Sequence, residues 1–129
     1  MKKGITAGAF DLLHTGHVAM LEEAKQHCDY LIVALQTNPS LDRPTEKNTP
    51  IQSIFERYFQ LKACRFVDEI IPYDTEQDLY NLLCAIKPDI RIIGEEYRDK
   101  HFTGRDLPIE IYYNSRKHPY SSSELRKRL

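Results

Sequence analysis

The chain has 129 residues, 41% of them hydrophobic, and a formal net charge of −1 at pH 7. This length is typical of one domain, and we expect residues 1–129 to form it. The balanced charge argues against a nucleic-acid partner, because duplex binding calls for a broad basic face. No apolar run approaches the roughly 18 residues that span a bilayer, so no membrane partner is expected.

The first residues and the cysteines bear on the location of the protein. Residues 1–5 lack the apolar core and the small-residue cleavage site of a signal peptide. Cys28, Cys64 and Cys84 form no close pair and show no metal-ligand spacing. This pattern favours reduced, mostly buried thiols, so we expect a cytoplasmic protein without disulfides.

Apolar runs alternate with helical periodicity from the start of the chain. Residues 5–7 and 31–35 read as strands, and the second run is continuous enough for burial on both faces of a sheet. Between them, apolar residues recur at three- and four-residue steps, which predicts a helix over residues 17–27. A polar loop at 38–49 and a second helix at about 51–64 follow.

The second half of the chain continues this alternation. Strands are predicted at residues 66–71 and 90–93. A helix should run between them from residue 74 to residue 86. Its start is indicated by Asp74 and Gln77, which resemble a capping box with an acid in place of the usual hydroxyl.

Two further elements are predicted after Gly94. Residues 109–113 alternate between apolar and polar and read as a fifth, partly exposed strand. Ser121 and Glu124 form an S-x-x-E box that opens a short terminal helix. The order of elements predicts an α/β fold, with a mostly parallel sheet and helices on both faces. Ligands in such folds bind beyond the carboxyl ends of the strands.

The segment GAFDLLHTGH, residues 8–17, lies where that fold binds its ligands. It leaves the first strand and enters the first helix, whose N-terminal N–H groups and partial positive charge suit phosphate. Gly16 lets a phosphate or a base approach the backbone, and Gly8 lets the loop pass close beneath a ligand. His14 and His17 can both donate hydrogen bonds to one phosphate and so stabilise charge that develops during transfer.

Two other interpretations of the histidine pair stay open. His-x-x-His can be half of a metal site, although no third ligand stands at a useful spacing and Asp11 alone does not complete one. A lone histidine is also often a satisfied core residue. The spacing alone therefore leaves phosphate binding, metal binding and a structural role as alternatives.

His14-Thr15-Gly16-His17 matches the HxGH signature of the nucleotidyltransferase superfamily. The longer segment, with the helix and strand that follow it, resembles the cytidylyltransferase branch, and above all the bacterial glycerol-3-phosphate cytidylyltransferases. The resemblance covers essentially the whole chain. It implies a Rossmann-like five-stranded parallel sheet, a homodimer, and Mg²⁺-dependent transfer of CMP from CTP to a small phosphorylated acceptor such as glycerol 3-phosphate, with release of pyrophosphate.

The resemblance also implies which residues form the site. The catalytic set comprises His14, His17, Lys47 and Arg116. The nucleotide-binding set comprises Gly8, Ala9, Phe10, Asp11, Gly16, Arg57, Gly94, Glu96, Tyr120, Ser121, Ser122 and Ser123. Mg²⁺ would be held mainly through the triphosphate, and Asp11 is the protein group that could approach it.

The chain departs from the family pattern at two places. Pro119 stands where the family has a glycine before the run of hydroxyl residues. After Gly94 the acids are glutamates rather than aspartates, and Tyr97 replaces a tryptophan. The first departure changes the turn that would bind the triphosphate. The second changes residues that would recognise the base or the acceptor.

Structural roles remain alternatives for several of these residues. Ser121 could be only an N-cap, Asp11 a turn cap, and Arg57 a member of a surface ion pair. Lys47 and Glu96 could be solvated side chains. At the level of the whole chain, the alternative functions are an ATP-using adenylyltransferase and a non-catalytic nucleotide-binding module.

Overall fold

The computed structural model describes residues 1–41 and 49–115. Its strands are β1 (Lys3–Gly8), β2 (Tyr30–Gln36), β3 (Glu69–Tyr73), β4 (Ile90–Gly94) and β5 (Glu110–Asn114). Its α-helices are α1 (Thr15–Lys25), α2 (Ile54–Lys62) and α3 (Glu76–Ile86), and short 3-10 turns lie at Pro39–Leu41 and Glu95–Tyr97. The predicted terminal helix that begins at Ser121 lies outside the described residues.

The five strands form one sheet in the order β3-β2-β1-β4-β5, and every neighbouring pair is parallel. The register places Ile5 of β1 beside Ile32 of β2 on one side and beside Arg91 of β4 on the other. The strand order reverses between β1 and β4, which is the switch point where open α/β sheets bind ligands. The predicted Rossmann-like fold is confirmed, and the fifth strand is parallel like the others.

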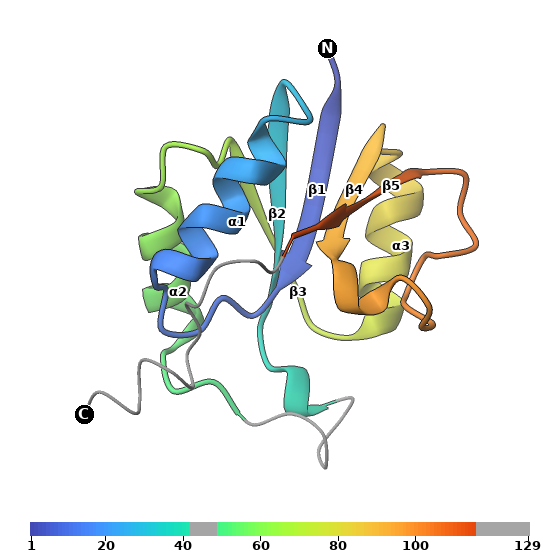
Figure 1. Cartoon of the computed structure of the whole chain (residues 1–129). Helices are drawn as coiled ribbons and strands as arrows, with labels where there is room; N and C mark the ends of the chain where they lie inside the picture. Colours follow the sequence, from blue (N-terminus) through green and yellow to red (C-terminus); the bar gives the residue numbers. More distant parts are fainter. Residues whose placement is uncertain (42–48, 116–129) are drawn as a thin grey trace.

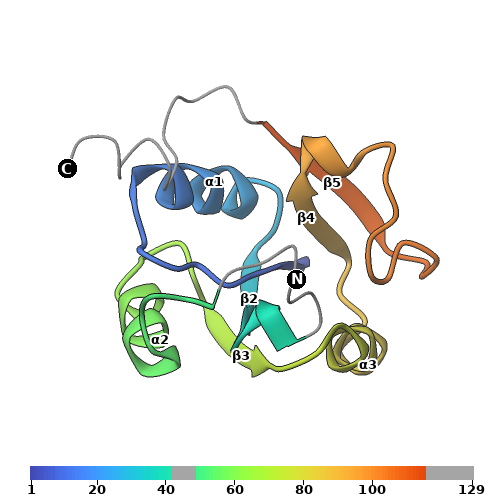
Figure 2. The ribbon, with the colours of Figure 1, turned by 90° about the horizontal axis from the view of Figure 1, so that it is seen from below.

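Helices cover both faces of the sheet, with α1 and α2 on one side and α3 on the other (Figures 1 and 2). The strand β2 shows why its apolar run has no polar face. Leu31, Val33 and Leu35 belong to the core beneath α1 and α2. Ile32 and Ala34 alternate with them and belong to the core on the α3 side. The sequence run therefore predicted burial on both faces correctly.

Several element boundaries differ from the sequence expectations. The helix α1 begins at Thr15 rather than at residue 17, and α2 begins at Ile54 rather than near residue 51. In both cases the side chain just before the helix caps it, namely His14 for α1 and Ser53 for α2. The strand β3 begins at Glu69, because the residues before it turn and the N–H of Val67 donates to the carbonyl of Cys64 at 3.2 Å.

The capping box of α3 is formed by Thr75 and Asp78, one residue later than the predicted pair. The Thr75 hydroxyl accepts from the N–H of Asp78, and the Asp78 carboxylate accepts from the N–H of Thr75, both at 3.1 Å. Asp74 is engaged elsewhere, because its carboxylate accepts from the hydroxyl of Thr37 at 2.6 Å. Two overlapping boxes compete at this helix start, and the hydroxyl residue forms the cap.

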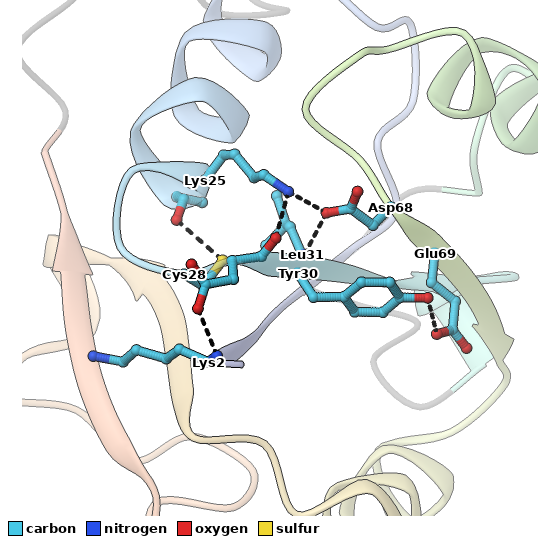
Figure 3. A network of polar contacts seen from close by, with 9 residues as sticks. Lys2, Lys25, Cys28, Tyr30, Leu31, Asp68 and Glu69 are labelled. Carbon is cyan, nitrogen blue, oxygen red and sulfur yellow. Dashed lines mark hydrogen bonds and ion pairs between the residues drawn. The ribbon is translucent and has the colours of Figure 1, made fainter.

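A network of polar contacts lies at the amino ends of the strands, opposite the switch-point loops (Figure 3). Lys25 of α1 forms an ion pair with Asp68 and donates to the carbonyl of Asp29 at 2.9 Å. The Asp68 carboxylate also accepts from the N–H of Leu31 at 2.8 Å. The hydroxyl of Tyr30 donates to Glu69 at 2.8 Å. These contacts tie α1, β2 and β3 together at the edge that carries no predicted site residue.

The three cysteines are free thiols. Cys28 and Cys64 are half-buried, but Cys84 is exposed on α3, contrary to the expectation of mostly buried thiols. Burial raises the pKa of the Cys28 thiol, and the nearby Lys25 only partly offsets this effect. Across residues 1–41 and 49–115, no helix has the length and the apolar character needed to cross a membrane.

Candidate functional site

The predicted ligand loop leaves the sheet at its switch point. Gly8 ends β1, and the neighbouring strands β2 and β4 end at Gln36 and Gly94. The loop of residues 9–14 then carries the chain into α1 (Figure 1). The HxGH segment therefore lies at the carboxyl edge of the central strand, as the sequence predicted.

His14 and His17 cap the first helix reciprocally. The Nδ1 atom of His14 accepts from the N–H of Gly16 at 3.0 Å, and the Nδ1 atom of His17 accepts from the N–H of His14 at 3.3 Å. The two imidazole rings stack with their centroids 4.0 Å apart. The histidines thus take the positions that a hydroxyl residue and an acid occupy in an ordinary capping box.

This capping arrangement decides which nitrogen of each neutral imidazole carries the proton. An Nδ1 atom that accepts a hydrogen bond is unprotonated, so the proton of each ring lies on Nε2. His14 and His17 therefore both present Nε2–H as a donor, on stacked rings at the N-terminus of a helix. That combination of donors and helix dipole suits a phosphate group.

Two residues of the loop adopt the left-handed backbone conformation without being glycine. Phe10 has φ 50° and Leu12 has φ 53°. Such conformations cost on the order of 1–2 kcal/mol each and persist only where surrounding contacts impose them. Packing of the Phe10 side chain imposes this conformation at Phe10. The residue is 6% exposed and packs in the core under α1, and its ring centroid lies 5.4 Å from that of His17. Phe10 can therefore offer a nucleotide its backbone but not its ring face.

Asp11 and Gln52 tie the loop to the start of α2. The Asp11 carboxylate accepts from the N–H groups of Ile51 at 2.8 Å and of Gln52 at 2.9 Å. In return, the side-chain oxygen of Gln52 accepts from the N–H of Leu12 at 2.8 Å. The sequence analysis allowed Asp11 to cap a local turn. Asp11 does bind backbone N–H groups, but those groups lie 40 residues further along the chain.

The contacts of Asp11 also bear on the predicted metal. Each of its oxygens already accepts from a backbone N–H, so binding a cation would compete with both hydrogen bonds. In the described part of the chain, His, Cys, Asp and Glu side chains form no group of three or more that could hold a metal ion. The prediction that Mg²⁺ is held mainly through the triphosphate stays a prediction.

Arg57 is buried, with 2% of its surface exposed, so the alternative of a surface ion pair is wrong. Its guanidinium donates to four backbone carbonyls, those of Gln36 at 2.6 Å, Thr37 at 2.5 Å, Ala9 at 3.0 Å and Gln52 at 3.1 Å. Burial lowers the pKa of Arg57, and the negative charge of Asp11 partly offsets this effect. We therefore interpret Arg57 as a positioning residue, because backbone carbonyls occupy four of its five N–H donors. Its predicted contact with the nucleotide stays a prediction.

We call these contacts of Asp11, Gln52 and Arg57 the α2 brace. They join the ligand loop, the end of β2 and the start of α2. Gln52 shows no sequence signal for this role, and only its place shortly before a predicted helix hints at a structural function.

The end of β4 brings two further predicted residues to the same edge. The carboxylate of Glu96 lies over the backbone at Gly94, and a Cβ atom there would push this flexible side chain aside. Arg98, at the end of the following turn, lies over the Tyr113 ring at 4.3 Å. Arg105 donates to the carbonyl of Arg98 at 2.9 Å and so holds this turn in place. The prediction that Gly94 and Glu96 contact the nucleotide stays a prediction.

Glu23 is a residue that the sequence reasoning missed. Its carboxylate accepts from the hydroxyl of Tyr112 at 2.7 Å and from the N–H of Ser115 at 3.1 Å. The side chain of Asn114 donates to the carbonyl of Met20 at 3.2 Å. The end of β5 is therefore fixed against α1 immediately before Arg116. Six predicted site residues lie outside the described residues: Lys47, Arg116, Tyr120, Ser121, Ser122 and Ser123.

Comparison with known proteins agrees with this fold. A family model described as cytidylyltransferase-like matches residues 5–128, and the chain belongs to this family. It is 35% identical over 124 residues to the bifunctional protein HldE of Campylobacter jejuni subsp. jejuni serotype O:6, covering 96% of this chain and 27% of that protein. It is 39% identical over 109 residues to HldE of Caulobacter sp. strain K31, covering 84% of this chain and 22% of that protein.

The chain thus spans about a quarter of the length of these curated relatives. Among solved structures, a lipopolysaccharide core biosynthesis protein from Thermoplasma volcanium GSS1 is similar with a TM-score of 0.72 and 28% identity, over 89% of this chain and 97% of that one. Pantoate-β-alanine ligase from Francisella tularensis shares the fold, with a TM-score of 0.63 and 19% identity over 97% of this chain and 65% of that one.

Proposed function

We propose that this chain transfers a nucleotidyl group from a nucleoside triphosphate to the phosphate of a small acceptor and releases pyrophosphate. The observation that carries the proposal is the reciprocal cap of His14 and His17, which makes both Nε2 atoms proton-bearing donors at a helix N-terminus. Donors fixed in this way act where charge develops in a transition state. The nucleotidyltransferase-like family of the chain supports the same reaction class.

The reaction needs no general base, because a phosphate oxygen of the acceptor is already nucleophilic at neutral pH. This oxygen attacks the α-phosphorus, and the bond to the bridging oxygen of the leaving pyrophosphate breaks in line with it. His14 and His17 donate to the oxygens of the α-phosphate. Lys47 and Arg116 hold phosphates from two sides, and Ser121–Ser123 meet the β- and γ-phosphates. Mg²⁺, when bound through the triphosphate, would neutralise part of its charge.

For the nucleotide we propose CTP, because the segment of residues 8–17 resembles the cytidylyltransferases. For the acceptor we favour a sugar phosphate over glycerol 3-phosphate. The solved relative from Thermoplasma volcanium is named a lipopolysaccharide core biosynthesis protein, and that core is a saccharide. The departures at Glu96 and Tyr97 from the glycerol-3-phosphate pattern leave room for an acceptor other than glycerol 3-phosphate.

The test is pyrophosphate release by the purified chain with Mg²⁺. CTP, ATP, GTP and UTP are each crossed with a panel of sugar phosphates and with glycerol 3-phosphate, and the His14→Ala variant is the control. Release with CTP and one sugar phosphate is expected. Release with ATP alone would replace CTP and make the chain an adenylyltransferase. Nucleotide binding without release on any acceptor would indicate a non-catalytic module and refute the transfer.

We further propose that the protein is a cytoplasmic homodimer that pairs through α2. Ile51, Phe55 and Phe59 are 65%, 71% and 63% exposed, and the two phenylalanine rings lie 6.0 Å apart. Large apolar side chains that are this exposed and lie beside each other, as Phe55 and Phe59 do, mark candidate contacts between proteins. Sedimentation should show a dimer that Phe55→Asp dissociates, and a monomeric wild type would refute the pairing.

A further inference from the structure

The side-chain oxygen of Gln52 forms a hydrogen bond with the ligand loop. Gln52 belongs neither to the histidine motif nor to the predicted nucleotide-binding residues. This oxygen accepts from the N–H of Leu12 at 2.8 Å. The backbone N–H of Gln52 donates to Asp11 at 2.9 Å, and its carbonyl accepts from Arg57 at 3.1 Å. Gln52 is therefore the member of the α2 brace that bonds to both of the other members and to the loop itself.

The contact falls on a residue that needs support. Leu12 has a left-handed backbone with φ 53°, which a leucine rarely adopts. An amide hydrogen bond to Leu12 fixes the plane of the peptide between Asp11 and Leu12. His14 follows two residues later, so a rotation of that peptide would shift the imidazole that caps α1.

The geometry points to Gln52 as a positioning residue for His14 and His17. Its side-chain oxygen holds the turn at Leu12, and this turn sets where the two Nε2 donors lie relative to the bound phosphate. Catalysis by prearranged donors is sensitive to such placement, and a displacement of about 1 Å can cost on the order of a hundredfold in rate. The inference rests on the proposed transfer, because it assigns a rate effect to the same histidines.

Two variants separate the acceptor oxygen of the Gln52 side chain from its shape. Gln52→Met keeps nearly the same length but removes the acceptor, whereas Gln52→Glu keeps an acceptor oxygen at the same distance. Gln77→Ala is the matched control, because Gln77 lies on α3 and its amide donates to the exposed Asn81. Neither Gln52 nor Gln77 belongs to the catalytic or nucleotide-binding residues of the proposed function.

For Gln52→Met we expect kcat to fall roughly tenfold while KM for the nucleotide changes less than about threefold. The variant loses one neutral hydrogen bond, and the resulting displacement of the histidine donors adds to the loss of rate. Gln52→Glu should keep kcat within about threefold of the wild type, and Gln77→Ala should not change it. Hydrogen exchange of the Leu12 amide, followed by NMR, should accelerate in Gln52→Met and stay slow in Gln52→Glu.

A second NMR measurement keeps the test independent of activity. The ¹⁵N shifts of His14 and His17 report which nitrogen carries the proton, and Gln52→Met should mix the two tautomers. Wild-type kcat in Gln52→Met together with fast Leu12 exchange would overturn the inference. So would unchanged Leu12 exchange, because the hydrogen bond would then not hold the turn. If the wild type transfers nothing, the proposed function fails, and the tautomer shifts alone decide whether Gln52 positions the histidines.

Discussion

Replacing Arg57 by lysine tests whether this residue acts by holding the loop or by binding the nucleotide. The guanidinium reaches carbonyls in three separate segments, represented by Ala9, Gln36 and Gln52. A lysine ammonium donates from a single point and cannot span them. At least two of these carbonyls, which are buried at Gln36 and partly buried elsewhere, would therefore lose their partner.

The expected loss follows from these unpaired groups. A buried carbonyl left without a donor costs about 1–3 kcal/mol, and a partly buried one costs about 1 kcal/mol because water reaches it. Arg57→Lys should therefore lower the free energy of unfolding by about 2–4 kcal/mol. For a chain of this size that corresponds to a fall in the melting temperature of roughly 10 °C. Urea unfolding at pH 7 without nucleotide measures the difference directly.

The control is Arg65→Lys, because Arg65 is exposed and its guanidinium lies over the Phe66 ring at 5.2 Å. We expect this variant to change stability by less than about 1 kcal/mol. A wild-type urea midpoint for Arg57→Lys, together with weakened nucleotide binding, would show that Arg57 is a direct ligand. The assignment of Arg57 to the brace would then be wrong.

Three further predictions follow from particular contacts. Replacing His14 or His17 by alanine should lower the rate of pyrophosphate release by on the order of a hundredfold or more, and normal turnover in both variants would remove them from the mechanism. Burial raises the pKa of Asp68, but hydrogen bonds from Lys25 and the N–H of Leu31 and the charge of Lys25 outweigh it, so the folded pKa lies below the ordinary value. The stability that ionised Asp68 contributes is therefore complete above the unfolded pKa of about 3.9 and is lost as the pH falls through the folded pKa. Asp68→Asn should lower the urea midpoint at pH 7 and lower it much less at pH 2.5. An equal effect at both pH values would contradict the ion pair. Gly104 has φ +84°, and a Cβ there would lie 2.6 Å from Leu83 Cδ1, so Gly104→Ala should destabilise the fold by about 1–3 kcal/mol in urea unfolding, whereas a neutral result would mean that this loop can rearrange.

The sheet was predictable because its signal is local. The run of residues 31–35 has no polar position, and a strand covered on both faces is the arrangement in which such a run is stable. The position of the ligand loop was predictable for the same reason, since His14 to His17 sit between a strand pattern and a helix pattern. Both features depend on neighbours within a few residues.

The start of α3 shows where local signals compete. Asp74 and Thr75 each begin a plausible capping box. The choice depends on Thr37, which follows β2 and donates a hydrogen bond to the Asp74 carboxylate. Arg57 shows the same limit for burial. An arginine on a helix is usually exposed, and its sequence neighbours do not reveal that four carbonyls lie within its reach.

The site combines local and distant contacts, and the two do different things. The contacts of His14 with Gly16 and His17 span two or three residues and decide which nitrogen donates. The α2 brace spans about 40 residues and decides where the loop that carries these donors lies. Because a catalytic hydrogen bond depends on position as well as on the donor, the HxGH motif supplies only one of two requirements. A chain that kept the motif but lost the brace would lose the alignment of the donors and, as the histidine cap loosens, the single tautomer as well. The brace is therefore the feature to examine when a protein with this motif proves inactive.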